Sequence, residues 1–195
     1  MISDEKSIRV VLASKSPRRR QLLREIVGDF EIITKETDEA LPKEIHPEKG
    51  VEILAVRKGF AVAEGLPYDA LVISSDTLVE LSGIPLGKPC GREDAVNMLL
   101  TLSGKTHRVH TGIAIHYKGR VYSGVDSSAV TFREISREEA EEYVDTGEPL
   151  DKAGAYAIQG IGAKFVRKYE GEFESIVGLS LRLCRKLIKE ALDND

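Results

Sequence analysis

Apolar residues along the first half of the chain follow two periods, and their order predicts an α/β arrangement. Short apolar runs typical of strands cover residues 7–13, 30–34 and 70–75. Segments with helical spacing cover residues 17–27 and 50–64, between those runs. We therefore expect strands and helices to alternate over this part of the chain.

The pattern changes after residue 90. Helical spacing predicts a helix over residues 92–102, and Ser103-Gly104 supplies its stop. Residues 106–117 and 120–132 are typical of two long strands, and Lys118-Gly119 between them is a hairpin signal. Parallel and antiparallel strands are thus expected in one mixed, twisted sheet flanked by helices.

The last third of the chain begins with a capping box, Ser136 with Glu139, which predicts a helix ending near residue 147. A glycine-rich stretch follows at residues 151–163, and it is typical both of a loop that approaches a ligand and of an ordinary surface loop. A strand over residues 164–169 and an amphipathic helix over residues 179–192 complete the prediction. With 195 residues and no linker-like segment, one domain covering residues 1–195 is expected.

Composition restricts the class of protein. The chain has 42% hydrophobic and 31% charged residues, and its net charge is -4, which gives no support to general nucleic-acid binding. Its two cysteines, Cys90 and Cys184, are far apart and suit a reducing compartment. No apolar run approaches the roughly 20 residues that a membrane span requires. We therefore expect a cytoplasmic protein that neither spans nor binds a membrane.

The segment Val10–Arg20 combines an apolar run with hydroxyls and arginines at the point where a helix begins. Ser16 suits an N-cap and Pro17 the first helical turn. The free N–H groups and partial positive charge of a helix start favour anions, so Ser14 and the arginines predict a phosphate-binding corner. The alternative is a capped helix whose basic first turn is solvated.

A second polar segment interrupts an apolar run at Ser74–Thr77. If Asp76 stands at the carboxyl end of a buried strand, it faces the crevice where α/β proteins bind ligands, and it suits a Mg²⁺ ligand or a general base. The alternative is an aspartate that closes the strand in a turn. Lys88 stands between Gly87 and Pro89 in a stiff turn, and it suits a phosphate contact or plain solvation.

Five motifs then occur in order between about residues 8 and 192. They are Ala13-Ser14-x-Ser16-Pro17-Arg18-Arg19, Ser75-Asp76-Thr77, Gly87-Lys88-Pro89, Leu102-Ser103-Gly104-x-x-His107, and Asp151-Lys152-Ala153-Gly154-Ala155-Tyr156-x-Ile158-Gln159-Gly160. Together they resemble the Maf family, the nucleoside triphosphate pyrophosphatases also called septum-formation inhibitors. Each motif alone is weak, whereas five in register are specific.

The resemblance implies an ITPase-like α/β fold with two lobes around a cleft, and hydrolysis of a nucleoside triphosphate that depends on Mg²⁺ or Mn²⁺. Asp76 matches the family's proton acceptor, and Glu39 falls on a second acidic position. These two residues are the expected metal ligands. Lys58 and Lys88 fall on the family's catalytic lysine positions. Ser14, Arg18 and Arg19 match its phosphate-binding corner, and Arg20 has no assigned role.

The form of the last motif resembles the branch of the family that acts on dTTP and UTP, and modified pyrimidine triphosphates are a further expected substrate class. Gln159 offers the donor and acceptor that uracil or thymine requires, and Arg18 and Thr77 match the other specificity positions. The alternatives are the 7-methyl-GTP branch and a non-catalytic nucleotide sensor that inhibits septum formation in dividing cells. The expected partner is the nucleotide, and a homodimer is the one protein assembly considered.

Overall fold

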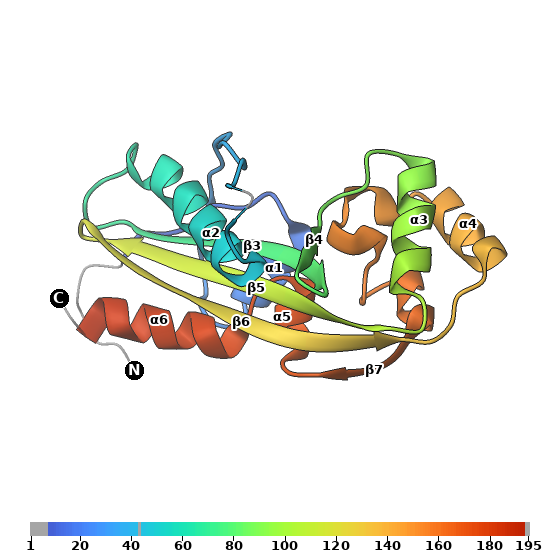
Figure 1. Ribbon diagram of the computed structural model, residues 1–195. Coiled ribbons are helices and arrows are strands. Elements are labelled where there is room, and N and C mark those ends of the chain that lie inside the picture. Colours follow the sequence, from blue (N-terminus) through green and yellow to red (C-terminus); the bar gives the residue numbers. More distant parts are fainter. Residues whose placement is uncertain (1–7, 43, 194–195) are drawn as a thin grey trace.

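A computed structural model describes residues 8–42 and 44–193 of the chain. Its strands form one sheet in the order β2-β1-β3-β5-β6-β7, with β4 beside β3 (Figure 1). The strands are β1 (Val10–Leu12), β2 (Glu31–Ile32), β3 (Leu71–Leu81), β4 (Ile84–Leu86), β5 (Thr106–Tyr117), β6 (Arg120–Phe132) and β7 (Val166–Glu170). Strand β1 is parallel to β2 and β3, and the other neighbours are antiparallel, so the predicted mixed sheet is confirmed.

Six α-helices and three short 3₁₀ helices accompany the described strands. They are α1 (Pro17–Leu23), α2 (Pro47–Ala63), α3 (Arg92–Leu102), α4 (Arg137–Asp145), α5 (Phe173–Val177), α6 (Leu181–Asp193), η1 (Glu148–Asp151), η2 (Ala153–Ala155) and η3 (Ile161–Phe165). A search of the described helices finds none with the length and apolar character needed to cross a membrane.

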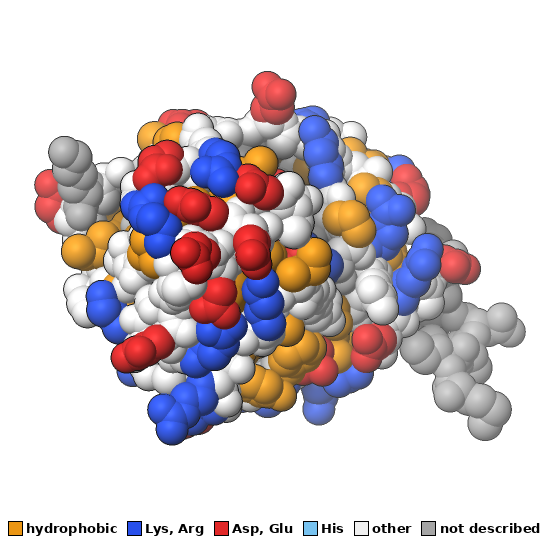
Figure 2. Space-filling model, turned by 90° about the vertical axis from the view of Figure 1, so that its right-hand side faces the viewer, with side chains coloured by type: hydrophobic (Ala, Val, Ile, Leu, Met, Phe, Trp, Pro, Cys, Tyr) orange, Lys and Arg blue, Asp and Glu red, His pale blue; other side chains and the backbone are white. Residues whose placement is uncertain are grey.

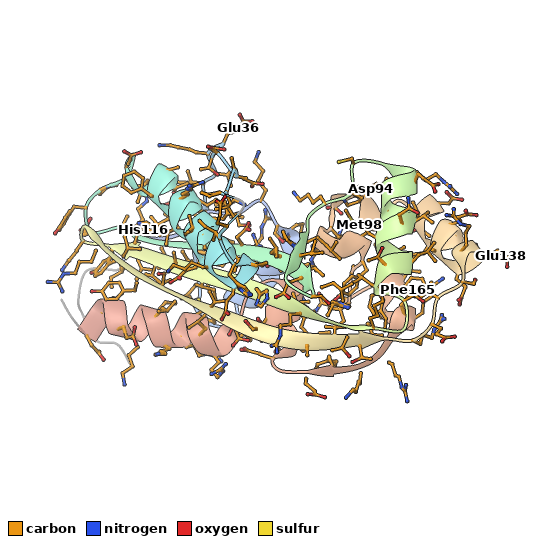
Figure 3. The ribbon with its side chains drawn as sticks, viewed as in Figure 1. Glu36, Asp94, Met98, His116, Glu138 and Phe165 are labelled. Carbon is orange, nitrogen blue, oxygen red and sulfur yellow. The ribbon has the colours of Figure 1, made fainter. Side chains whose placement is uncertain are left out.

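The molecule has two lobes that share the long strands β5 and β6 (Figure 1). At one end, α2 covers one face of the sheet and α6 the other, and at the other end stand α3, α4 and the 3₁₀ helices. Side chains such as His116, beneath α2, and Phe165, beside α3, fill the space between layers (Figure 3). On the face formed by the α3 and α4 end, acidic and basic side chains are interspersed (Figure 2).

Elements with strong local signals match the prediction closely. The β5–β6 hairpin turns at Lys118 and Gly119, both with positive φ, and Ser136 and Glu139 form the predicted capping box. Helix α1 ends at Leu23, four residues earlier than predicted. The first predicted strand begins in the structure at Val10, and its residue 7 lies outside the described residues.

Strand β3 differs from the prediction in a way that matters for function. It continues to Leu81, so Asp76 stands in the middle of a strand, and its predicted place at a strand end is wrong. On one edge, β3 pairs with β5 along most of its length. On the other edge, β1 pairs only as far as Ile73 and β4 begins only at Val79. Within the described chain, no strand covers the intervening edge, and we call residues 74–78 the open edge.

Two glycines allow α2 to lie close to the sheet next to the open edge. A Cβ on Gly112 of β5 would stand 2.5 Å from the Val51 carbonyl oxygen, and one on Gly59 of α2 would stand 2.5 Å from the Ser74 hydroxyl. Protein interiors are packed densely enough that such contacts cannot be absorbed without backbone movement. The glycines therefore fix how near the side chains of α2 come to β3.

The Gly112→Ala variant is expected to lower the free energy of unfolding by about 1–3 kcal/mol, because the added methyl group overlaps rigid backbone. Urea denaturation measures the loss. Gly28→Ala is the matched control, since nothing lies within 4 Å of a Cβ there. Equal stabilities of the two variants would contradict the close approach of α2.

Candidate active site

A cavity of about 980 Å³ opens at the uncovered edge of β3, between the two lobes. The corner after β1, the loop before α2, the turn after β4 and the glycine-rich segment all contribute to its wall. Every site residue predicted from the sequence lines it: Ser14, Arg18, Arg19, Glu39, Lys58, Asp76, Thr77, Lys88 and Gln159. The topology thus brings together residues that are as much as 145 positions apart, from Ser14 to Gln159.

The cavity has the opposite charge balance from the chain. Seven lining residues are lysine or arginine and four are aspartate or glutamate, although the chain as a whole has net charge -4. Field lines concentrate in a cleft with low-dielectric walls, so this local excess attracts an anion more strongly than the same charges on a flat surface. The cavity therefore favours a polyanionic ligand.

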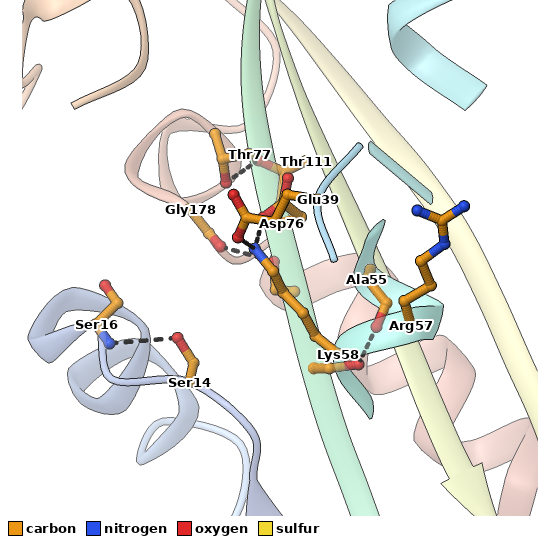
Figure 4. Close-up of polar contacts among 12 residues, drawn as sticks. Ser14, Ser16, Glu39, Ala55, Arg57, Lys58, Asp76, Thr77, Thr111 and Gly178 are labelled. Carbon is orange, nitrogen blue, oxygen red and sulfur yellow. Dashed lines mark hydrogen bonds and ion pairs between the residues drawn. The ribbon is translucent and has the colours of Figure 1, made fainter. Parts of the chain in front are cut away.

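Lys58 of α2 lies between the two predicted acidic residues (Figure 4). Its Nζ is 2.5 Å from Asp76 Oδ1 and 2.7 Å from Glu39 Oε1. The hydrogen bond from Lys58 lowers the pKa of Glu39 most, and the charges of Lys88 and Arg19 lower it further. Both carboxylates thus meet at one ammonium group, with Glu39 largely exposed and Asp76 mostly buried.

Arg19 organises the opposite side of the open edge. Its Nε donates to the Gly178 carbonyl at 2.9 Å, Nη2 to the Thr77 hydroxyl at 3.0 Å and Nη1 to the Ser14 hydroxyl at 3.3 Å. Burial lowers the pKa of Arg19, with the charge of Asp76 acting in the other direction, but a guanidinium stays protonated in proteins. Three of its five N–H donors are used, and two are left for a ligand.

The contact of Asp76 with Lys58 and the contact of Thr77 with Arg19 belong to two polar clusters. The clusters lie on opposite sides of β3, because neighbouring residues of a strand point to opposite faces of the sheet. Asp76 faces Lys58 of α2, whereas Thr77 faces Arg19 and bonds the Thr111 hydroxyl at 3.1 Å. The uncovered strand edge joins the clusters, and both of them line the same cavity.

Three predicted binding residues keep their polar groups free for a ligand. Across residues 8–42 and 44–193, no hydrogen bond or ion pair is found for the side chains of Arg18, Lys88 or Gln159. Lys88 and Gln159 are exposed and Arg18 is half-buried. The Gln159 amide in particular is not bonded to the backbone of its own loop in the described contacts, so its donor and acceptor groups can meet a ligand.

The acidic pair also fits a divalent metal. The described residues contain no group of three or more His, Cys, Asp and Glu side chains arranged as a metal site. Mg²⁺, however, is bound in many nucleotide enzymes by one or two carboxylates together with substrate phosphates and water. Glu39 and Asp76 already converge on one cation, the Lys58 ammonium, and this donor set suits such an ion.

The structure adds residues that motif reasoning did not single out. Lys152 and Asp151 line the cavity as an ion pair, and Arg57 Nη1 donates to the Ala40 carbonyl at 2.7 Å, which holds the loop that carries Glu39. The Gly178 carbonyl, which accepts from Arg19 and from Ser75, has no sequence signature because every residue has one. Arg20 is exposed and stands outside the cavity lining, as a solvated helix residue would.

Comparison with known proteins assigns this chain to a family. The family model described as Maf-like protein matches residues 9–191. The chain belongs to the Maf family. A relative from Moorella thermoacetica is 47% identical over 182 residues, covering 92% of this chain and 93% of that protein. A relative from Bacillus velezensis is 43% identical over 182 residues, covering 93% and 96%. Both relatives are named dTTP/UTP pyrophosphatase.

Among solved structures, the Ham1 protein of Staphylococcus aureus aligns over 95% of both chains with a TM-score of 0.49 and 17% sequence identity. The described architecture of this Maf-family chain, a mixed sheet with helices and two lobes, agrees with the predicted fold class.

Proposed function

We propose that this Maf-family protein hydrolyses dTTP and UTP to the nucleoside monophosphate and pyrophosphate. The observation that carries the proposal is the pair of carboxylates, Glu39 and Asp76, inside a cavity whose lining is otherwise rich in cations. Carboxylates beside a polyanion repel it unless a cation stands between them, so a site that only bound nucleotide would gain nothing from them. The names of the relatives from Moorella and Bacillus supply the substrate class.

Asp76 is the residue proposed to take the proton from the attacking water. It is mostly buried, and its Oδ1 is fixed by Lys58, which leaves the second oxygen to orient a water at the α-phosphorus. A divalent ion held by Glu39 and Asp76 would supply charge neutralisation on the phosphate oxygens. Lys58 then stands beside the reacting phosphate with its charge already in place.

The remaining cations are placed to hold the triphosphate tail. Arg19 keeps two N–H donors free, and Arg18 and Lys88 reach the cavity with no hydrogen bond or ion pair to the described residues. Negative charge accumulates on pyrophosphate as it leaves, and fixed cations stabilise that charge without reorganisation. Ser14 and Thr77 contribute by holding Arg19 in position.

Gln159 is proposed to recognise the base. Its amide oxygen would accept the N3–H of uracil or thymine, and its NH₂ would donate to a ring carbonyl. We predict that Gln159→Glu lowers the ratio of kcat/KM for UTP to that for CTP at least about tenfold, since a carboxylate cannot donate to O4 but can accept from the cytosine amino group. An unchanged ratio would remove Gln159 from base recognition.

The proposal as a whole is tested by incubating the protein with dTTP, UTP, CTP, GTP and 7-methyl-GTP and measuring pyrophosphate with Mg²⁺, with Mn²⁺ and with chelator. The expected result is release from dTTP and UTP that chelator abolishes. Binding of UTP without release of pyrophosphate would instead indicate a nucleotide sensor. Preferred hydrolysis of 7-methyl-GTP would assign the chain to the other branch of the family.

A further inference from the structure

We propose that Tyr143 and Glu148 are positioning residues that set base selectivity through the loop carrying Gln159, although neither side chain lines the cavity. This inference rests on the proposed function, because it assigns a cause to the placement of the base-recognising amide. Residues 157–162, here called the base loop, are the link between the cavity and the pair formed by the buried Tyr143 and the half-buried Glu148.

The two side chains bind the base loop on both sides of Gln159. Glu148 Oε1 accepts from the Ile161 amide at 3.1 Å, and Oε2 accepts from the Gly162 amide at 3.0 Å. The Tyr143 hydroxyl donates to Glu148 Oε2 at 2.7 Å and accepts from the Ala157 amide at 3.1 Å. The backbone amides two residues before Gln159 and two and three residues after it are thereby tied to one polar pair.

The backbone of the base loop lies directly on this pair. A Cβ on Gly160 would overlap the Glu148 carboxylate, and one on Gly162 would stand 2.6 Å from the Tyr143 hydroxyl. Only glycine permits so close an approach at these two positions. The loop therefore takes its path from the two polar groups together with the packing of Ile158 into the hydrophobic core.

Donor and acceptor in the pair are fixed. Burial raises the pKa of Tyr143 well above its usual range, and the bond to Glu148 raises it further. Burial alone would raise the pKa of Glu148, but the bonds from Tyr143, Gly162 and Ile161 bring it below its usual value. At neutral pH the phenol is always the donor and the carboxylate always the acceptor, so the loop is held in one arrangement.

The Gln159 side chain depends on this support because it has none of its own. It is exposed, it lines the cavity, and no hydrogen bond to it is found in the part of the chain that the structure describes. An amide can present its donor and acceptor to uracil, or turn over and present them to cytosine. Recognition of uracil requires the amide oxygen at N3–H and the NH₂ at O4 together, so a shift of the loop backbone would weaken this pairing.

The test is the ratio of kcat/KM for UTP to that for CTP in Glu148→Gln and Tyr143→Phe. We expect a fall of about tenfold or more in both, since displacement of a positioned group by about 1 Å can cost up to 100-fold. Glu139→Gln is the matched control. Glu139 lies on α4, the helix that carries Tyr143, and like Glu148 it accepts three hydrogen bonds, from Arg133 and Ser136, but none of these bonds comes from the base loop. It should lower the melting temperature and leave the ratio unchanged.

The Gln159→Ala variant provides a second background, which separates the positioning of Gln159 from a general loss of stability. In Gln159→Ala, the further change Glu148→Gln should not alter the ratio, because the group being positioned is gone.

In the wild-type protein, the amides of Ile161 and Gly162 should exchange with solvent slowly although Ile161 is exposed. This measurement does not require any variant to fold.

The outcomes are distinct. If wild-type protein prefers UTP and Gln159→Ala relaxes the preference, but Glu148→Gln and Tyr143→Phe keep the wild-type ratio, the inference is wrong and the proposed function stands. It is also wrong if Glu148→Gln lowers the ratio equally in the Gln159→Ala background, or if the two amides exchange fast. If wild-type protein does not prefer UTP, base recognition by Gln159 and the inference fail together.

Discussion

Replacing Asp76 by asparagine is expected to lower kcat for UTP at least about 100-fold, the usual size of a general-base effect. The substitution keeps the shape of the side chain, which is mostly buried in the middle of β3, and removes its charge and its ability to take a proton. It also removes one of the two carboxylates proposed to hold a divalent ion. Steady-state release of pyrophosphate measures the loss.

The matched control for this substitution is Asp69→Asn. Asp69 is an exposed aspartate just before β3 and lies outside the cavity, so its loss should change kcat by less than about twofold. If Asp76→Asn kept near-normal turnover in the same assay, Asp76 would not be the proton acceptor, and the proposed chemistry would need another base.

Replacing Lys58 by methionine is expected to lower kcat about 100-fold, the usual effect of removing one preorganised group that stabilises developing charge. Lys58 also holds Asp76 and Glu39, so its loss leaves two carboxylates close together without their cation. The pKa of Glu39 should then rise toward its ordinary value, because the bond from Lys58 is the largest cause of its lowering. Titration by NMR measures that rise independently of activity.

The pH dependence of stability follows from the contact between Lys58 and Glu39. A carboxylate whose pKa is lowered by folding favours the folded state above its unfolded-state pKa, and this contribution is lost as the pH falls through the folded value. In Lys58→Met, the part of the acid-side loss of stability that is due to Glu39, which begins as the pH falls below the ordinary glutamate pKa of about 4.3, should shrink. The effect is small because Glu39 is 61% exposed.

Lys49→Met is the control for Lys58→Met. Lys49 lies on the same helix, α2, and pairs with Glu52 at 2.6 Å on the exposed surface. Its loss should leave kcat and the pKa of Glu39 unchanged. Equal effects of the two substitutions would show that α2, and not the ammonium between the carboxylates, is what activity requires.

Much of the fold follows from local signals in the sequence. The hairpin at Lys118-Gly119 and the capping box at Ser136 are decided by a few neighbouring residues, and the structure has them where the sequence predicts them. Helix α5, with five residues, and strand β4, with three, are too short to show a period and were not predicted. Strand β3 continues beyond its predicted end because its polar residues have partners other than bulk solvent. Ser74 and Ser75 are buried and donate to the backbone carbonyls of Ala55 and Gly178, whereas Asp76 and Thr77 face the cavity.

The site could be predicted only as a set of residues, not as a geometry. Resemblance to the family supplied nine of the residues that line the cavity. Seven of them have a recognisable side chain in one of the five short motifs, whereas Glu39 and Lys58 were matched by position outside those motifs. Long-range partners have no such signal: Arg19 depends on the Gly178 carbonyl, 159 residues away, and Lys58 meets Glu39 only because α2 lies close to the sheet. These contacts come from topology, and the open edge of β3 is their origin.

The most direct test of the central claim is to let the protein hydrolyse UTP in water enriched in oxygen-18 and to follow the label by mass spectrometry. Water positioned by Asp76 at the α-phosphorus predicts one labelled oxygen in UMP and none in pyrophosphate. Label in pyrophosphate would place the attack at the β-phosphorus, and formation of UDP and inorganic phosphate would mean that a different bond breaks. Either result would contradict the proposed role of the cavity.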